Sequence, residues 1–523
     1  MITHATRPSL ALAAILVLAW AFLFSIALGE LVVEDGNAVF IPDSVASERA
    51  SLTALFAATG GDKWYLKSGW NTDANICTWS GVCCGSPINA PAIVSFKDGF
   101  DAHLNCVKDN GSSVVALLLR QNNLQGTIPK SIAGLSGLEF ITVGGNPNLI
   151  TTNLFQLPRL KILFVDNCNL LTIPDEIAQA KQLYFIDFAL NSLSSIPDVF
   201  CDYPNLSHIG GAYNNLVYLP DCWRAGSSIS EFIFPYNSLV EIPESLSMVG
   251  NLSMLDVRYN KLTAVPPSMF ALPHLNVLAL DNNNIEIIPD SIASWKGELL
   301  GVSYNVIRTL PLAMGSLEAT LKIRLAGNQI EDIPPSVFKG WKHLTYLDIS
   351  ENVLTQIPTT IGDISRLEHL DLSYNLLADI PVELTLLKNL SFIDLSYNNI
   401  TTNSLYIGTF HHLQQAHLAG NCISGLDAGT ENIPQSLRLI DVSANCFRTL
   451  PKLLGQFPNL QVLIVSNNLL RSFPEEVFSL NRTLGTLLLD ANEMMGTIPQ
   501  TFGAMRALTM LSLADNSLSG SIP

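Results

Sequence analysis

The segment Leu367–Pro381 reads LEHLDLSYNLLADIP and contains the pattern L-x-x-L-x-L-x-x-N-x-L, followed by Ile-Pro. Leu370 and Leu372 alternate with polar neighbours, as a short strand with one buried face requires. Asn375 ends this strand, and its amide can satisfy backbone groups of its own turn and of the next turn. Pro381 lacks an N–H group, which suits the start of a return segment.

The same pattern recurs with a period of 22 to 24 residues and defines 18 units. Their asparagine position is held by Asn122, Asn146, Cys168, Asn191, Asn214, Asn237, Asn260, Asn283, Asn305, Asn328, Asn352, Asn375, Asn398, Asn421, Asn445, Asn468, Asn492 and Asn516. A fixed period of this length indicates a solenoid in which each unit packs on its neighbours. We therefore predict an α/β solenoid with a parallel β-sheet on its concave face.

Residues 114–523 resemble the leucine-rich-repeat superfamily, which implies a horseshoe or superhelix. The outer units, such as Gln125-Gly126-Thr127-Ile128-Pro129, resemble the plant-type G-x-I-P repeat. The middle units, such as Leu354-Thr355-Gln356-Ile357-Pro358, resemble the repeats of intracellular Ras-scaffold proteins. Because both repeat types occur in one chain, the repeat type alone does not predict the compartment.

An apolar run from Leu10 to Leu28 follows His4 and Arg7 near the start of the chain. This pattern predicts either a cleaved secretory signal or an uncleaved signal anchor over residues 1–29. Both alternatives place the residues after Gly29 on the extracytoplasmic side of a membrane. Residues 30–47 are then expected to be a linker, and the protein is expected to be secreted or held at the cell surface.

Residues 48–112 are predicted to cap the first repeat of an array that spans residues 113–523. An open solenoid needs such a cover for its first hydrophobic face. The segment Cys77–Cys84 reads CTWSGVCC and resembles the N-terminal cap of plant receptor-like leucine-rich-repeat proteins and polygalacturonase inhibitors. Cys83 and the stretch from Gly85 to Ser113, which includes Cys106, depart from that compact cap.

The chain has nine cysteines, and four of them lie in or beside the cap. There we expect two disulfides, with Cys77–Cys84 and Cys83–Cys106 as the favoured pairing. Cys422 and Cys446 follow the corner asparagine in adjacent repeats, within disulfide reach of each other. Cys201 and Cys222 form a further candidate pair, which would leave Cys168 buried and free. The alternative is that the repeat cysteines are small core or surface residues.

N-x-S/T sequons mark candidate glycosylation sites. They occur at Asn110, Asn205, Asn251, Asn389, Asn399 and Asn481. A single sequon is a weak signal in a chain rich in asparagine. The six together agree with the predicted signal and the cysteine-containing cap.

The formal net charge is −17, from 28 basic and 45 acidic side chains. Nucleic acid is therefore excluded as a partner, because phosphate binding needs a basic surface. A protein or peptide ligand of basic character would be steered favourably towards the chain. The alternative is that the acidity only keeps a large protein soluble.

Outward strand positions over residues 346–397 carry acidic residues flanked by aromatic ones. The candidate ligand-binding residues are Tyr346, Asp348, His369, Asp371, Tyr374, Phe392, Asp394 and Tyr397. Like charges on adjacent strands cost energy unless a cation meets them, and aromatic side chains supply contact area. The alternative is that L-D-L-S-x-N is common repeat wording and that each tyrosine only packs on the next turn.

The sequence contains no P-loop, kinase motif set, G-x-S-x-G or H-E-x-x-H motif, so we predict neither an enzyme nor a cofactor or metal site. The predicted function is non-catalytic recognition of a protein or peptide by a receptor-like or inhibitor-like protein. The alternative is a membrane-tethered intracellular signalling scaffold. Because the sequence stops at Pro523 within a repeat and shows no C-terminal cap, we expect either truncation or a co-receptor or capping partner that covers Leu511, Leu513 and Leu518.

Overall fold

The computed structural model describes residues 43–85, 113–401, 405–406, 409–427 and 433–523. The described residues fall into two compact units. Unit 1 ends at Leu193 and also includes Tyr203–Ile209, and unit 2 comprises Ser194–Asp202 and Gly210–Pro523. The predicted signal or anchor (1–29) lies outside the described residues.

Unit 1 combines the cap with the first repeats. Its helices are α2 (Asp43–Ala58) and the 3-10 helices η2 (Gly61–Lys63), η3 (Ile76–Thr78), η5 (Lys130–Gly134), η6 (Thr152–Leu154) and η7 (Asp175–Gln179). Its strands are β1 (Val82–Cys84), β2 (Val114–Leu118), β3 (Gln125–Thr127), β4 (Phe140–Thr142), β5 (Asn148–Ile150), β6 (Ile162–Phe164) and β7 (Phe185–Asp187), and β8 (His208–Gly210) has residues in both units. β2, β4, β6 and β7 pair in parallel in that order.

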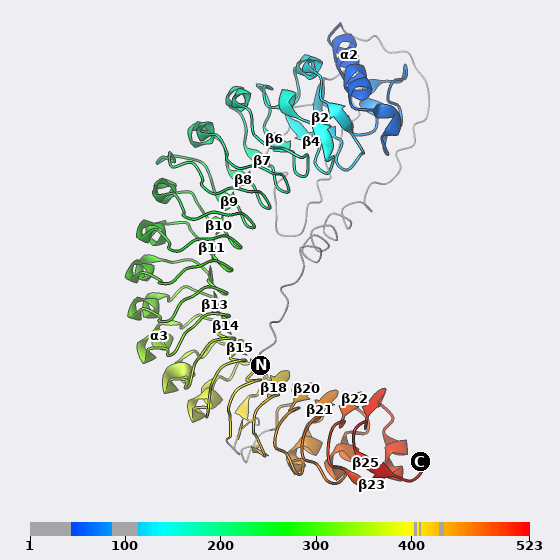
Figure 1. Ribbon diagram of the computed structural model, residues 1–523, viewed down its shortest axis with the longest axis vertical. Coiled ribbons are helices and arrows are strands. Elements are labelled where there is room, and N and C mark those ends of the chain that lie inside the picture. Colours follow the sequence, from blue (N-terminus) through cyan, green and yellow to red (C-terminus); the bar gives the residue numbers. More distant parts are fainter. Residues whose placement is uncertain (1–42, 86–112, 402–404, 407–408, 428–432) are drawn as a thin grey trace. The chain divides into compact units, whose positions relative to one another are not determined.

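Unit 2 continues the repeats with the same alternation of strand and helix (Figure 1). Its strands are β9 (Glu231–Ile233), β10 (Met254–Asp256), β11 (Val277–Ala279), β12 (Leu299–Gly301), β13 (Lys322–Arg324), β14 (Tyr346–Asp348), β15 (His369–Asp371), β16 (Phe392–Asp394), β17 (Leu405–Tyr406), β18 (Gln415–His417), β19 (Leu426–Asp427), β20 (Leu439–Asp441), β21 (Val462–Ile464), β22 (Thr486–Leu488), β23 (Met495–Thr497), β24 (Met510–Ser512) and β25 (Ser517–Ser519). Its helices are η8 (Asp198–Asp202), η9 (Glu244–Met248), η10 (Pro267–Ala271), η11 (Asp290–Ser294), η12 (Leu312–Ser316), α3 (Pro335–Gly340), η13 (Thr359–Asp363), η14 (Val382–Leu386), η16 (Lys452–Gln456), η17 (Glu475–Leu480) and η18 (Gln500–Ala504).

One parallel sheet runs through unit 2 from β9 to β24, and consecutive repeats contribute neighbouring strands. In β15 the middle residue Leu370 is fully buried, whereas His369 and Asp371 on either side are only partly buried. The following Leu372 is again buried. The alternation predicted from the leucine pattern therefore forms the core, and it leaves the first and third residues of each strand on the outer face of the sheet.

The corner asparagine holds each strand end in place. The Nδ2 group of Asn375 donates to the carbonyl oxygens of Ile349, Leu372 and Ser373 at 3.0–3.2 Å, and its Oδ1 accepts from the N–H of Leu354 at 3.0 Å. Ile349 and Leu354 belong to the preceding turn. The prediction that this amide serves its own turn is confirmed, but the prediction that it serves the next turn is wrong, because the polar groups within reach lie one turn earlier.

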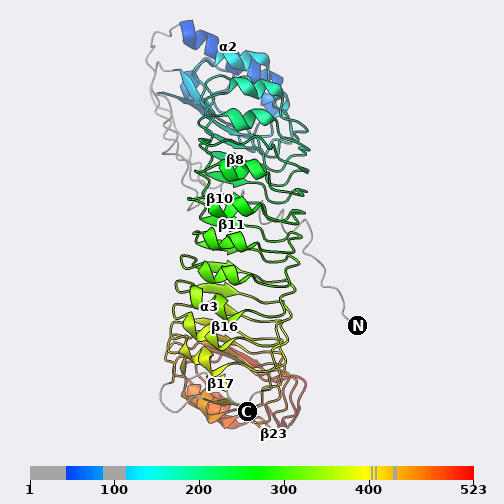
Figure 2. The same ribbon diagram turned by 90° about the vertical axis from the view of Figure 1, so that its left-hand side faces the viewer.

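The return segments lie on the side of the repeats away from the strands (Figures 1 and 2). In most described repeats the proline of the Ile-Pro step precedes a short helix and accepts its first hydrogen bond, as the carbonyl of Pro381 does from the N–H of Leu384 at 3.1 Å. Nearly all of these helices in the described repeats are 3-10 helices of three to six residues, and α3 is the exception. A repeat of 22 to 24 residues leaves little chain for a longer helix after the strand and both turns.

The cap has an aromatic centre and an antiparallel strand. Trp70 packs between Trp64 and Trp79, with ring centroids 4.8 and 5.1 Å apart. β1 pairs antiparallel with β2, and a side-chain atom on Gly81 would lie 2.3 Å from the carbonyl oxygen of Leu118. The glycine of the CTWSGVCC segment is therefore required by close approach to the first repeat. Helix α2 begins at Asp43, earlier than residue 48 where we placed the start of the cap.

Candidate ligand-binding face

Strands β14, β15 and β16 bring six of the predicted ligand-binding residues together on the outer face of the sheet. Their register aligns Tyr346, His369 and Phe392 in one row. It aligns Asp348, Asp371 and Asp394 in a second row, two residues further along each strand. We call these the aromatic row and the acidic row.

The aromatic row is a continuous stack. The His369 ring lies 4.2 Å from the Tyr346 ring and 4.2 Å from the Phe392 ring, and both interplanar angles are 6°. Burial lowers the pKa of His369, partly opposed by the carboxylates of Asp348 and Asp394. The imidazole is therefore uncharged at neutral pH, so this row is an uncharged aromatic surface beside the carboxylates.

The carboxylates of the acidic row are oriented by hydrogen bonds from the backbone of their own repeats. In each of its members one carboxylate oxygen, Oδ1, accepts from the backbone N–H two residues later, at 2.8–3.1 Å. Burial, and then the carboxylates of Asp348 and Asp394, raise the pKa of Asp371 to about 6, although hydrogen bonds from Ser373 lower it. Within the described part of the chain, none of the three carboxylates forms an ion pair.

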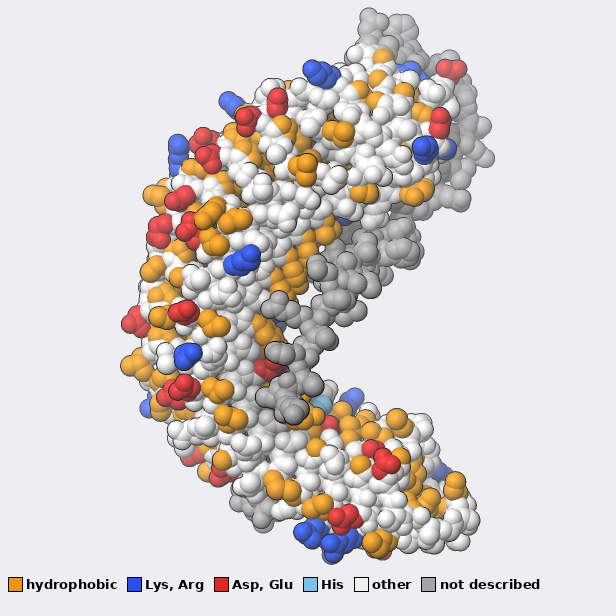
Figure 3. All heavy atoms as spheres, in the orientation of Figure 1, with side chains coloured by type: hydrophobic (Ala, Val, Ile, Leu, Met, Phe, Trp, Pro, Cys, Tyr) orange, Lys and Arg blue, Asp and Glu red, His pale blue; other side chains and the backbone are white. Residues whose placement is uncertain are grey.

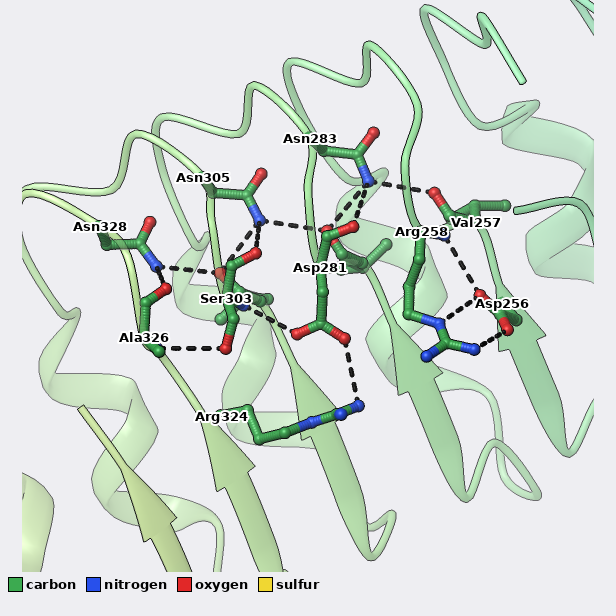
Figure 4. A network of polar contacts seen from close by, with 12 residues as sticks. Asp256, Val257, Arg258, Asp281, Asn283, Ser303, Asn305, Arg324, Ala326 and Asn328 are labelled. Atoms are coloured by element: carbon green, nitrogen blue, oxygen red, sulfur yellow. Dashed lines mark hydrogen bonds and ion pairs between the residues drawn. The ribbon is translucent and has the colours of Figure 1, made fainter. Parts of the chain in front are cut away.

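Other acidic residues of the same face are neutralised by arginines of the chain itself (Figure 4). The guanidinium of Arg258 donates to both carboxylate oxygens of Asp256, at 2.9 and 2.7 Å. Nη2 of Arg324 lies 3.1 Å from Oδ2 of Asp281, an ion pair in which that oxygen accepts no well-aligned hydrogen bond. Sequence reasoning missed Asp281, because it occupies a position that holds serine in the clearest repeats.

Tyr374 and Tyr397 form a third feature, beside the corner asparagines. Their rings stack with centroids 4.4 Å apart, as the packing alternative predicts, yet 53% and 50% of their surfaces remain exposed. Both have left-handed backbones, with φ of 53° and 54°. Such a conformation costs a non-glycine residue about 1–2 kcal/mol, and glycine holds the equivalent position at Gly327 and Gly420. The same column is left-handed in other described repeats, for example at Leu190, Glu351 and Ala444, so this conformation belongs to the repeat corner.

Three disulfides are described, and they join Cys77 to Cys84, Cys201 to Cys222 and Cys422 to Cys446. Cys83 is also disulfide-bonded, but Cys106 lies outside the described residues, so the Cys83–Cys106 pairing stays a prediction. Cys168 is buried with a free thiol, whose pKa is raised to about 12 by burial and by Asp166. Its Sγ lies 3.4 Å from the carbonyl oxygen of Val143, where other repeats have the asparagine amide.

The sequons differ in exposure. Asn205, Asn251, Asn389 and Asn399 are exposed, and Asn481 is half-buried. Asn110 lies outside the described residues. The side-chain amides of Asn251 and Asn389 donate to backbone carbonyls of the preceding turn at 2.9 Å. Among the described residues the side chain of Asn399 forms no hydrogen bond, so its amide nitrogen is more open to glycosylation than those of Asn251 and Asn389.

Charged side chains of both signs are interspersed along the helix side of the repeats (Figure 3). Among the residues that the structure describes, no three His, Cys, Asp or Glu side chains come close enough together to hold a metal ion. The described helices also include none with the length and apolar character needed to cross a bilayer.

Comparison with known proteins supports the repeat assignment. The leucine rich repeat family model matches residues 250–307, 321–377 and 458–518. A leucine-rich-repeat protein of Leptospira interrogans is 26% identical with a TM-score of 0.60, and the match covers 74% of this chain and 93% of that one.

Plant receptors share the fold at lower identity. The plant peptide hormone receptor RGFR1, solved in complex with RGF2, is 24% identical with a TM-score of 0.55, over 77% of this chain and 78% of that one. The ectodomain of the Arabidopsis receptor kinase HAESA, in complex with an IDA peptide hormone, is 23% identical with a TM-score of 0.53, over 92% and 87%. Three segments of the chain thus match the leucine rich repeat family, and the fold resembles that of plant leucine-rich-repeat receptors.

Proposed function

We propose that this protein is a non-catalytic receptor-like or inhibitor-like protein that binds a basic peptide segment on the outer face of its sheet. The ligand would contact the aromatic row, the acidic row and the pair Tyr374 and Tyr397. The observation that carries the proposal is the acidic row itself, three aligned carboxylates without a counter-ion in the described chain, lying beside stacked aromatic rings.

The chain's own ion pairs strengthen this reading. Adjacent strands lie about 4.8 Å apart, so neighbouring carboxylates repel each other unless a cation is present. Asp256 has the same strand position as Asp371, and there the chain supplies Arg258 as the cation. At Asp371 the residue equivalent to Arg258 is Ser373, which cannot neutralise the charge. A ligand with lysine or arginine side chains would supply what these repeats lack.

We also propose an extracytoplasmic location. Disulfides persist in oxidising compartments and are rare in the cytosol, and the described residues contain three. The exposed sequons and the apolar run near the start of the chain agree with this location. Gel mobility before and after removal of N-glycans tests it, because a downward shift is expected for a glycosylated secretory protein. An unchanged mobility, with the protein retained in the cytosol, would favour the intracellular scaffold.

The binding proposal is tested with arginine-rich and glutamate-rich decapeptides immobilised on a biosensor surface. We expect the protein to bind the arginine-rich peptide, and we expect the double variant Asp371→Lys/Asp394→Lys to lose that binding. The matched control is Asp290→Lys/Asp363→Lys, which makes the same charge change at exposed residues of helices η11 and η13. Equal binding by the two double variants would refute the assignment of this face.

A further inference from the structure

The outer face of unit 2 changes its chemistry along the first row of strand positions. Met254, Val277 and Leu299 are aligned in register on β10, β11 and β12. All three are apolar and only partly buried. Sheet positions that face outward are normally polar, so three consecutive apolar side chains form a surface that a ligand can cover.

Lys322 follows Leu299 in the same row, on β13. It is exposed, and it forms no ion pair with any residue that the structure describes. The other charged side chains on the outer positions of β10–β13, Asp256 and Arg324, are already neutralised, because Asp256 pairs with Arg258 and Arg324 pairs with Asp281 (Figure 4). Among the described outer residues of β10–β13, the ammonium of Lys322 is therefore the charged group without an ion-pair partner.

Tyr346, the first member of the aromatic row, pairs with Lys322 in the sheet register. The apolar strands, the lysine and the proposed site are therefore contiguous. From β10 to β16 the order is apolar, cationic, and then aromatic with acidic. Six strand steps of about 4.8 Å give a length of about 29 Å, which is the length of about nine residues of extended chain.

We propose that the ligand is an extended peptide whose side chains follow the complementary order, with an apolar block on β10–β12, a carboxylate at Lys322 and basic residues on the acidic row. The proposal rests on the proposed function for its basic end and adds the apolar block and the carboxylate. Tyr259 and Tyr304, 41% and 46% exposed, border the apolar strands on the corner side. They would flank the apolar block as Tyr374 and Tyr397 flank the basic end.

The face favours an extended chain over a compact partner because its chemistry changes along one line, strand by strand. In an extended peptide, alternate side chains point to the same side, so a block of a few residues can meet one group of strands. A partner that offered one uniform patch would satisfy the apolar strands or the acidic row, but not both with the lysine between them.

The test uses synthetic peptides in both chain directions, since the order of side-chain chemistry alone does not fix the direction of the ligand chain. The full probe has a leucine block, one aspartate and an arginine block, separated by glycine. The shuffled probe has the same composition, with the aspartate and one arginine exchanged. The two half probes are the leucine–aspartate block alone and the arginine block alone. Binding to the full-length protein is measured by biosensor titration.

We expect the full probe to bind about tenfold more tightly than the shuffled probe or the arginine half. Lys322→Glu should remove this gain and leave the arginine half unaffected. Lys339→Glu is the matched control, because Lys339 is an exposed lysine of helix α3, away from the face. Leu299→Asn should also reduce the gain, and it separates the apolar contribution from the charge.

The outcomes distinguish this proposal from the one on which it rests. Equal binding of the full and shuffled probes, or an unchanged gain in Lys322→Glu, would overturn the ordered ligand while the arginine half still binds. Failure of the arginine half to bind would overturn the proposed function. In that case the binding of the leucine–aspartate half probe tests the rest of the proposal. If Lys322→Glu abolishes this binding and Asp371→Lys does not, the apolar and cationic part of the site is still supported.

Discussion

Replacement of Gly301 by alanine should break the ion pair between Asp281 and Arg324. The two charged side chains meet over β12, where Gly301 leaves room for them. An alanine Cβ at this position would lie 2.6 Å from Oδ2 of Asp281 and 2.9 Å from Nη2 of Arg324, closer than any real Cβ contact. One of the two charged groups must therefore move away.

The expected cost follows from the geometry of the pair. At 3.1 Å and an effective dielectric constant of about 20, the attraction is about 5 kcal/mol. The side chain of Arg324 is 33% exposed, so water recovers part of this, whereas the side chain of Asp281 is only 7% exposed and would keep an uncompensated charge. We expect Gly301→Ala to lower the free energy of unfolding by about 2–4 kcal/mol.

Urea unfolding of the full chain, with hydrogen exchange of the β12 amides, measures this cost. Gly250→Ala is the matched control, because a Cβ there meets nothing within 4 Å. In the background Asp281→Ser/Arg324→Ser, the added methyl group has no ion pair to displace, and its cost should fall below about 1 kcal/mol. The reasoning is refuted if Gly301→Ala and Gly250→Ala are equally stable, or if the cost persists in that background.

Three further changes test the repeat and the face. Asn375→Ala removes four hydrogen bonds and should cost about 3 kcal/mol or more by urea unfolding, whereas Asn399→Ala, at an exposed asparagine, should cost far less. Because the pKa of Asp371 is about 6, the affinity of the protein for the arginine-rich peptide should rise between about pH 5 and 7 as this carboxylate ionises. Asp371→Asn should flatten that pH profile. This raised pKa also means that the contribution of Asp371 to folding stability is present at low pH and is lost as the pH rises through about 6. Tyr374→Gly should leave stability within about 1 kcal/mol, because relief of the left-handed backbone offsets the lost stacking on Tyr397, but it should weaken peptide binding.

The repeat register was predictable because each unit uses the same few buried positions. The pattern around Leu370, Leu372 and Asn375 places the core, the outer face and the corner from the spacing alone. The direction of the asparagine contacts was not predictable, since the sequence does not show which neighbouring turn offers free carbonyls. In the structure they belong to the preceding turn.

The candidate face was predictable as a set of aligned columns, but its charge balance was not. Arg258 and Asp256 lie two residues apart, so their pairing could be suspected, yet Arg324 reaches Asp281 across Gly301, two strands away. Such a contact depends on side-chain paths that no repeat pattern encodes. The left-handed backbone at the position before the corner asparagine could be predicted from the sequence, because glycine occupies that position at Gly327 and Gly420.

The contacts that the corner asparagines make between turns all point in one direction, from each turn to the turn before it. The carbonyl of Val257 accepts a hydrogen bond from the side chain of Asn283 in the following turn (Figure 4). The N–H of Leu262, in the same turn as Val257, donates to the same side chain. Each turn is thus completed by the asparagine of its C-terminal neighbour, and its own asparagine serves its N-terminal neighbour in the same way, as Asn305 does for Leu280 and Ile285. Fraying should therefore start in the repeat on the N-terminal side of any break, because that repeat loses the asparagine of the repeat that follows it. A repeat inserted by protein engineering would likewise need a corner asparagine in the repeat that follows it. Each repeat is therefore stabilised by the repeat that comes after it in the chain, and this direction follows from the order of the repeats in the sequence.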